Sequence, residues 1–182
     1  IHGHATELKA LLTKMDYREK DSVWQHPERK VIFLGDFVDR GPEQVETVTI
    51  AQNMVEKGQA LAVMGNHEFN AVAWATEYPQ NPSEYLRPHV EKNLNQHRAF
   101  LEQVGEGGEL HHSMIEWFKT LPVYLDSPDF RAVHACWHPE HLASIAKYTD
   151  EENRSFFGRS RLPLKNTRFR LVSRPTITYN NL

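Results

Sequence analysis

The sequence has little cysteine, no long apolar run and no excess of positive charge. Its single cysteine, Cys136, excludes an internal disulfide and fits a reducing compartment such as the cytoplasm. No apolar run approaches the ~18 residues that a membrane-spanning helix needs, so we expect no membrane partner. The net charge of -3 gives no strong nucleic-acid signal, because a general grip on nucleic acid needs an excess of Lys and Arg.

The composition is that of a globular domain. Of the 182 residues, 40% are apolar and 25% are charged, which excludes a disordered chain. We expect one domain over residues 1–182, in which residues 148–182 form an irregular or inserted segment because they show no sustained periodicity. Histidine is frequent, with 11 residues, and it is the commonest metal ligand in proteins.

Apolar residues recur at helical spacing in several segments, and short apolar runs lie between them. The spacing predicts helices over residues 5–15, 42–57, 68–76, 90–104 and 112–121. The short runs predict buried strands over residues 30–34, 59–64, 123–125 and 130–133. Residues 16–29 and 78–88 are polar or rich in proline, so we expect irregular connections there. Strands that alternate with helices predict an α/β fold with parallel pairing.

Four polar clusters stand out: HGH at 2–4, GDFVDRG at 35–41, GNHE at 65–68 and VHAC at 133–136. Three of them follow predicted strands, and the carboxyl ends of parallel strands share one edge of a sheet, so the clusters can converge. Their Asp, Asn and His side chains suit divalent Mn, Fe, Zn or Co better than calcium. One carboxylate can bridge two such cations ~3.5–4 Å apart, which together polarise a phosphoryl group.

Three further residues in these clusters suit chemistry on a phosphate. The planar guanidinium of Arg40 can hold two phosphate oxygens at once. His67 adjoins Asn66, so its imidazole can protonate a leaving alkoxide. Asp39 is the candidate to orient that imidazole through its other ring nitrogen.

The motifs GDFVDRG, GNHE and VHAC, in this order and spacing, resemble the calcineurin-like metallophosphoesterase superfamily. Within it they are similar to the serine/threonine phosphoprotein phosphatase branch of bacterial type, over about residues 1–140. The resemblance implies a four-layer α-β-β-α sandwich with two mixed β-sheets. It also implies two divalent metal ions, with Mn expected and Fe, Zn, Ni or Co as alternatives, and a metal-bound hydroxide as the attacking group.

The resemblance also implies a role for each matching residue. His2 would bind the first metal, Asp36 would bridge both, and Asn66 and His134 would bind the second. Arg40 and Asn66 would contact the substrate phosphate. His67 would be the general acid, oriented by Asp39; with Arg40 these form the implied catalytic set.

The chain departs from the family pattern at three places. The family's first motif begins with an aspartate two residues before the histidine, whereas this sequence begins at Ile1. A late metal-binding histidine is also missing, so we expect one further ligand before Ile1 and one after Leu182. The fourth motif has Ala135-Cys136 where protein phosphatases usually have two glycines.

The leading functional hypothesis is a phosphatase for phosphoserine, phosphothreonine or a small phosphate ester. One alternative is a dinucleoside tetraphosphate hydrolase; such enzymes more often carry Asp after Gly-Asn-His, so Glu68 argues against it. A polynucleotide phosphatase and a catalytically silent binding module are the others. His4, Cys136 and the His138–His141 pair are interpreted as lying outside the site.

Overall fold

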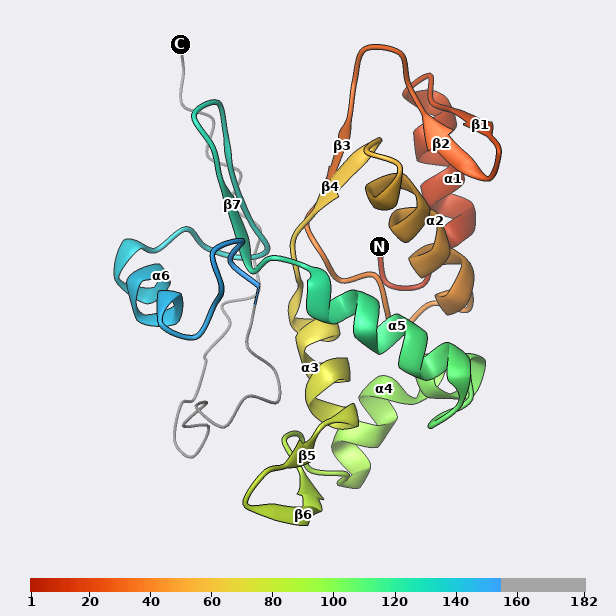
Figure 1. Ribbon diagram of the computed structural model, residues 1–182. Coiled ribbons are helices and arrows are strands. Elements are labelled where there is room, and N and C mark those ends of the chain that lie inside the picture. Colours follow the sequence, from red (N-terminus) through yellow and green to blue (C-terminus); the bar gives the residue numbers. More distant parts are fainter. Residues whose placement is uncertain (155–182) are drawn as a thin grey trace.

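The structure, a computed structural model, describes residues 1–154 of the chain. Helices and strands are mixed along this part, as the sequence predicts (Figure 1). In chain order they are α1 (Ala5–Lys14), β1 (Arg18–Lys20), β2 (Val23–Gln25), β3 (Val31–Phe33), α2 (Gln44–Glu56), β4 (Ala60–Ala62), α3 (Asn66–Ala75), β5 (Glu77–Tyr78), β6 (Asn81–Tyr85), α4 (Glu91–Val104), α5 (Glu109–Thr120), β7 (Tyr124–Asp126), β8 (Arg131–Val133) and α6 (Pro139–Ala146). None of the helices in residues 1–154 is long and apolar enough to cross a membrane.

The strands that carry the polar clusters pair as the sequence predicts. β3 and β4 are parallel, with Val31 opposite Ala60, and the N–H of Val63 donates to the Phe33 carbonyl at 2.9 Å. The other pairs, β1–β2, β5–β6 and β7–β8, are antiparallel. Within the described residues the named strands pair only in twos. The α/β class is therefore confirmed, while the two mixed sheets of the sandwich stay a prediction.

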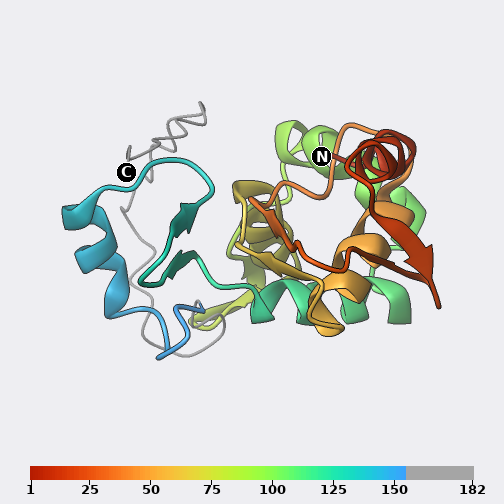
Figure 2. The same ribbon diagram turned by 90° about the horizontal axis from the view of Figure 1, so that it is seen from above.

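The core lies around β3 and β4. In both views, α1 and α2 lie on one side of this strand pair, and the β7–β8 hairpin with α6 lies on the other (Figures 1 and 2). Aromatic rings continue the core below the strands: the Phe37 ring lies 5.7 Å from that of Phe33 and 5.5 Å from that of Trp117. Phe118, which like Trp117 belongs to α5, is fully buried against Phe100. The core thus extends directly beneath the GDFVDRG loop.

Two segments predicted to be irregular contain hairpins instead. Residues 16–29 include β1–β2, joined by Asp21 and Ser22, whose φ values of 52° and 62° suit a tight two-residue turn. All three residues of β1 are exposed, so no alternation of apolar side chains marked it. Residues 78–88 include β6, and its Pro82 is tolerated because the strand is an exposed edge.

Burial was overestimated in the predicted strands. Phe33 and Ala62 are buried, but Ile32 is 37% exposed and Leu61 is 40% exposed. One face of the β3–β4 pair is therefore covered in the described chain, so the predicted burial of these two strands holds for that face alone. In α1, likewise, Leu8 and Leu12 are buried while Leu11 is 54% exposed.

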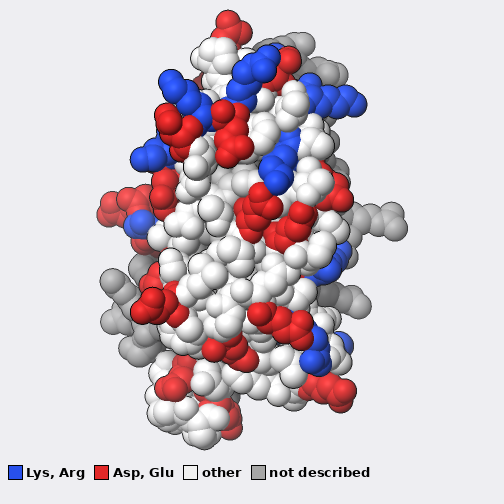
Figure 3. Space-filling model, turned by 90° about the vertical axis from the view of Figure 1, so that its right-hand side faces the viewer, with Lys and Arg blue, Asp and Glu red and all other residues white. Residues whose placement is uncertain are grey.

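The surface shows no broad basic patch on the side seen in Figure 3, where blue and red side chains are interspersed or red ones predominate. Near the C-terminal end of the described residues, Arg154 forms an isolated antiparallel β-bridge with Pro122, so residues 148–154 are connected to the rest of the fold. The rest of the predicted irregular segment, residues 155–182, lies outside the described residues.

Candidate metal centre

The GDFVDRG loop after β3 and the GNHE loop after β4, the two central loops, leave the strand pair at the same edge and touch. A Cβ atom placed on Gly35 would lie 2.2 Å from the backbone nitrogen of Gly65. A Cβ atom on Gly65 would lie 2.4 Å from the backbone nitrogen of Asp36. Only glycine permits this approach, which brings the GDFVDRG and GNHE motifs into contact.

Glu68 ties these loops together. α3 begins at Asn66, not at Glu68 as predicted, so Glu68 lies in its first turn and is 0% exposed. Its carboxylate accepts N–H groups from Asp36 at 2.8 Å, Phe37 at 2.8 Å and Gly65 at 3.0 Å. Burial and the charge of Asp36 raise the pKa of Glu68, and these N–H donors oppose that shift. Sequence reasoning missed this structural role.

The HGH segment is bound to the GDFVDRG loop through its backbone. The N–H of Gly3 donates to the Phe37 carbonyl at 2.7 Å, and the N–H of Gly41 donates to the His2 carbonyl at 2.8 Å. Several motif residues that are not glycine have left-handed backbones. Their φ values are 55° for His2, 56° for Asp36, 70° for Asp39 and 71° for Arg40. Such conformations are costly and gather at functional sites.

The four predicted metal ligands come together around the Asp36 carboxylate. Its Oδ2 lies 3.4 Å from Nε2 of His2, and its Oδ1 lies 3.4 Å from Nε2 of His134. Nε2 of His134 is also 3.2 Å from Oδ1 of Asn66. Ligands on a cation with bonds of about 2.1 Å stand roughly 3.0–3.4 Å apart, so these distances fit. The two carboxylate oxygens face two different groups of donors.

Both histidines are oriented as metal ligands usually are. The Nδ1–H of His2 donates to the Val38 carbonyl at 3.1 Å, and the Nδ1–H of His134 donates to the Leu34 carbonyl at 2.5 Å. The Nε2 lone pair of each ring therefore points to Asp36. Burial lowers the pKa of His2, which favours its neutral form. Lone pairs that face carboxylate oxygens are a suitable donor set for divalent cations.

His67 stands at the edge of this centre. Its Nδ1–H donates to Oδ2 of Asp39 at 2.5 Å, and its ring lies edge-on to His2 with centroids 4.7 Å apart. One ring nitrogen lies within 4.8 Å of ligand atoms of His2 and Asp36, a position open to a ligand or to a proton donor. Burial lowers the pKa of His67, but the hydrogen bond to Asp39 and the charge of Asp36 outweigh it and raise the pKa.

Asp39 has a second imidazole partner that sequence reasoning missed. Nδ1 of His97, on α4, lies 2.7 Å from Oδ1 of Asp39, 58 positions away in the chain. Burial raises the pKa of Asp39, but the hydrogen bonds from His67 and His97 outweigh it and hold the pKa below its usual value. The only signal in the sequence was a histidine on the apolar face of a predicted helix. Arg40 follows Asp39 in the loop and is exposed.

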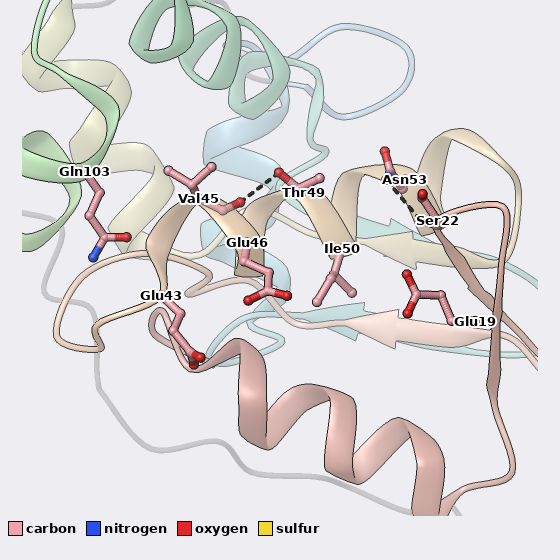
Figure 4. A pocket seen from close by; sticks show the side chains of 9 residues that line it. All are labelled: Glu19, Ser22, Glu43, Val45, Glu46, Thr49, Ile50, Asn53 and Gln103. Carbon is pink, nitrogen blue, oxygen red and sulfur yellow. Dashed lines mark hydrogen bonds between the residues drawn. The ribbon is translucent and has the colours of Figure 1, made fainter.

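The residues predicted to lie outside the site have other contacts. His4 pairs with Glu7 at 3.7 Å, the rings of His138 and His141 stack 4.2 Å apart at the start of α6, and Cys136 is exposed. A groove of about 430 Å³ lies along α2 (Figure 4). None of its lining residues is a predicted site residue. They are Glu19, Ser22, Glu43, Val45, Glu46, Thr49, Ile50, Asn53 and Gln103.

A comparison with known families agrees with this geometry. The family model for calcineurin-like phosphoesterases matches residues 1–172. The chain belongs to the calcineurin-like phosphoesterase family. The predicted superfamily is thus confirmed, and so, at the level of the family, is the predicted class of metal-dependent phosphoric ester hydrolase.

Curated relatives of this calcineurin-like phosphoesterase carry the names of enzymes that hydrolyse dinucleoside tetraphosphates. A Bacillus subtilis protein named bis(5'-nucleosyl)-tetraphosphatase PrpE, asymmetrical, is 41% identical over 154 residues, which are 82% of this chain and 59% of the relative. The protein of that name in Halalkalibacterium halodurans is 38% identical over 150 residues, 81% of this chain and 58% of the relative. A symmetrical bis(5'-nucleosyl)-tetraphosphatase of Hamiltonella defensa is 26% identical over 174 residues, 90% of this chain and 52% of the relative.

The chain of this calcineurin-like phosphoesterase spans between half and three fifths of the length of these relatives. Their names favour the alternative hypothesis, a dinucleoside tetraphosphate hydrolase, over the phosphoprotein phosphatase expected first. The use of Glu68 as an argument against that alternative fails on structural grounds. Its carboxylate is buried on backbone N–H groups, so it reports how the loops are held and not which substrate is bound.

Proposed function

We propose that the protein is a dinuclear metal-dependent hydrolase of dinucleoside polyphosphates. The position of the Asp36 carboxylate carries this proposal. One of its oxygens faces Nε2 of His2, and the other faces Nε2 of His134 beside Asn66. A carboxylate with different donors at each oxygen is suited to bridging two cations.

In this proposal His2 and Asp36 hold one cation, and Asp36, Asn66 and His134 hold the other. Manganese is the expected metal, with Fe, Zn, Ni or Co as alternatives, because imidazole and oxygen ligands suit all of them. When bound, the cations supply the Lewis acidity that polarises a phosphoryl group and activates water. The Nδ1 hydrogen bonds of His2 and His134 to backbone carbonyls keep both Nε2 atoms directed inward.

The remaining residues act on the substrate. Arg40 follows Asp39 in the same loop, is exposed, and would offer a forked set of donors to phosphate oxygens. The Asn66 side chain contributes to phosphate binding as well as to the metal. His67, held by Asp39, gives a proton to the leaving oxygen from Nε2. The four-layer sandwich and a single domain over residues 1–182 belong to this proposal too.

The names of the relatives support this substrate class. A phosphatase for phosphoserine, phosphothreonine or small phosphate esters would use the same residues, so products must distinguish the two. Water attack that breaks an outer phosphoanhydride bond of diadenosine tetraphosphate gives AMP and ATP, whereas attack that breaks the central phosphoanhydride bond gives two ADP. Attack on a monoester gives inorganic phosphate.

The test is to load the full chain with Mn²⁺ and analyse the products by ion-exchange chromatography. We expect AMP and ATP from diadenosine tetraphosphate, with a higher kcat/KM than for p-nitrophenyl phosphate or a phosphoserine peptide. His2→Ala should lose about 100-fold or more in kcat, since it removes a metal ligand. His4→Ala is the matched control, because His4 lies two residues on and pairs with Glu7 instead. A loaded protein that hydrolyses none of these substrates would refute the proposal.

A further inference from the structure

His97 reaches the site from a distant part of the chain. Its imidazole belongs to α4 and is 0% exposed. Nδ1 of His97 lies 2.7 Å from Oδ1 of Asp39, while Oδ2 of Asp39 lies 2.5 Å from Nδ1 of His67. Two imidazole rings therefore share one buried carboxylate, one bonded to each oxygen.

The hydrogens in this group can be assigned from the acceptor. An ionised carboxylate can only accept, so each ring donates to Asp39 from Nδ1. His67 is then left with Nε2 for the metal centre. Nε2 of His97 is buried and has no partner among residues 1–154. It lies in aromatic surroundings, with ring centroids 4.9 Å from Phe100 and 6.1 Å from Trp74.

Packing alone does not account for a histidine at this position. A buried polar nitrogen without a partner destabilises the fold. A leucine or phenylalanine would fill the same apolar surroundings without that cost. The hydrogen bond to Asp39 is the feature of His97 that such a residue lacks.

We propose that His97 is a positioning residue that fixes the Asp39 carboxylate and, through it, the ring of His67. A carboxylate held at one oxygen can rotate about its Cβ–Cγ bond, whereas one held at both oxygens cannot. The backbone of Asp39 is fixed as well, since its N–H donates to Oε1 of Gln44 at 2.7 Å. Small errors in the position of a proton donor lower the rate steeply.

This inference rests on the proposed function, because it concerns the proton that His67 gives up. As water oxygen forms its bond to phosphorus, the bond between phosphorus and the leaving oxygen breaks and its electron pair stays on that oxygen. The Nε2 proton of His67 then neutralises the leaving oxygen. A poor leaving group needs this proton, and a good one departs without it. The effect of His97 should therefore depend on the leaving group.

Two amide variants separate the hydrogen bond from packing. Asparagine in His97→Asn can place its amide N–H near the former Nδ1, whereas glutamine in His97→Gln places it near the former Nε2. The Mn²⁺-loaded full chain is assayed on phenyl and p-nitrophenyl esters, both of phosphate and of thymidine 5'-monophosphate. For His97→Gln we expect kcat to fall about 10- to 100-fold on phenyl esters and less than about threefold on p-nitrophenyl esters, with KM unchanged. His97→Asn should recover most of the loss.

A second measurement needs neither metal nor substrate. In the metal-free protein labelled with ¹⁵N-histidine, the Nδ1 proton of His67 should resonate far downfield, keep its position in His97→Asn and shift in His97→Gln. The matched control is His111→Leu. His111 is also buried beside Phe100, but its Nδ1 accepts the Gly107 N–H at 3.0 Å, so this variant should leave the His67 signal in place.

The outcomes distinguish this inference from the proposed function. If the wild type hydrolyses no ester but the His67 signal behaves as expected, the proposed function fails and the positioning role stands. The inference is overturned by a kcat loss in His97→Gln that is equal on both leaving groups, by an unchanged kcat, or by an unmoved His67 signal. If His97→Gln does not fold, His97→Leu replaces it, since leucine buries no polar group.

Discussion

Replacing Glu68 by glutamine tests whether one buried carboxylate holds the two central loops together. The change keeps the size of the side chain and removes one acceptor oxygen with the charge. In the wild type, Oε2 accepts the N–H groups of Asp36 and Gly65, and Oε1 accepts that of Phe37 and, at 3.4 Å, that of Val38. If the amide oxygen of glutamine takes the Oε2 position, its NH₂ group faces the N–H of Phe37, donor against donor.

The magnitude follows from these contacts. A buried N–H left without a partner costs about 1–3 kcal/mol, and two hydrogen bonds to a charged acceptor become weaker neutral ones at about 0.5–1 kcal/mol each. Removing the buried charge of Glu68 also removes its repulsion with Asp36, which offsets part of this loss of stability. We therefore expect Glu68→Gln to lower the free energy of unfolding by about 2–4 kcal/mol. For a chain of this size that is a fall in melting temperature of roughly 4–16 °C.

The assay is urea unfolding of the metal-free protein at pH 7, followed by circular dichroism. Glu109→Gln is the matched control, because Glu109 is also in the first turn of a helix but is exposed. That variant should change stability by less than about 1 kcal/mol, through the helix dipole alone. If Glu68→Gln unfolds at the same urea concentration as Glu109→Gln, the backbone N–H groups of these loops do not depend on the carboxylate and the reasoning fails.

Three further predictions concern the same loops. In EDTA, Asp36→Asn should be at least as stable as the wild type, because the change removes the repulsion between the carboxylates of Asp36 and Glu68. When Mn²⁺ is added, thermal melts should show a gain in stability for the wild type alone, since the variant has lost the bridging ligand. The pKa of Asp39 is lowered in the folded protein, so its carboxylate stabilises the fold above the unfolded pKa of about 3.9. This stabilisation is lost as the pH falls through the lower folded pKa. The difference in unfolding free energy between wild type and Asp39→Asn should therefore shrink below about pH 4. Gly35→Ala should abolish soluble folded protein because its Cβ meets Gly65, whereas Gly58→Ala, with φ of 68° and open space around it, should cost only about 1–2 kcal/mol.

The convergence of the polar clusters could be predicted from the sequence because it follows from topology. Two apolar runs that each end in glycine and are joined by a helix predict parallel strands with a shared edge. This places Asp36 beside Asn66, as the structure has it. The details of α3 could not be read in the same way. A predicted start at Glu68, two residues late, hid the fact that this side chain lies in the first turn and folds back onto the N–H of Gly65.

His97 marks the limit of sequence reasoning at this site. Its bond to Asp39 joins positions 58 apart and depends on how α4 packs, which no local pattern specifies. The hairpins β1–β2 and β5–β6 were missed for a different reason. β1 and β6 are largely exposed, and the buried residues Val23 and Trp24 of β2 are adjacent, so no alternation of apolar and polar residues distinguished these strands from loops.

The arrangement at Asp36 is electrostatically unfavourable by itself. Because Nδ1 of His2 and of His134 donate to backbone carbonyls, a neutral ring presents Nε2 as an acceptor, and both Nε2 atoms lie 3.4 Å from an acceptor oxygen of Asp36. Glu68 adds a second carboxylate on the other side of the loop, and its backbone donors offset its charge. Acceptors that face one another gain from a cation between them. The rigid backbone that Glu68 holds in place therefore maintains a site whose stability depends on the metal it is built to bind.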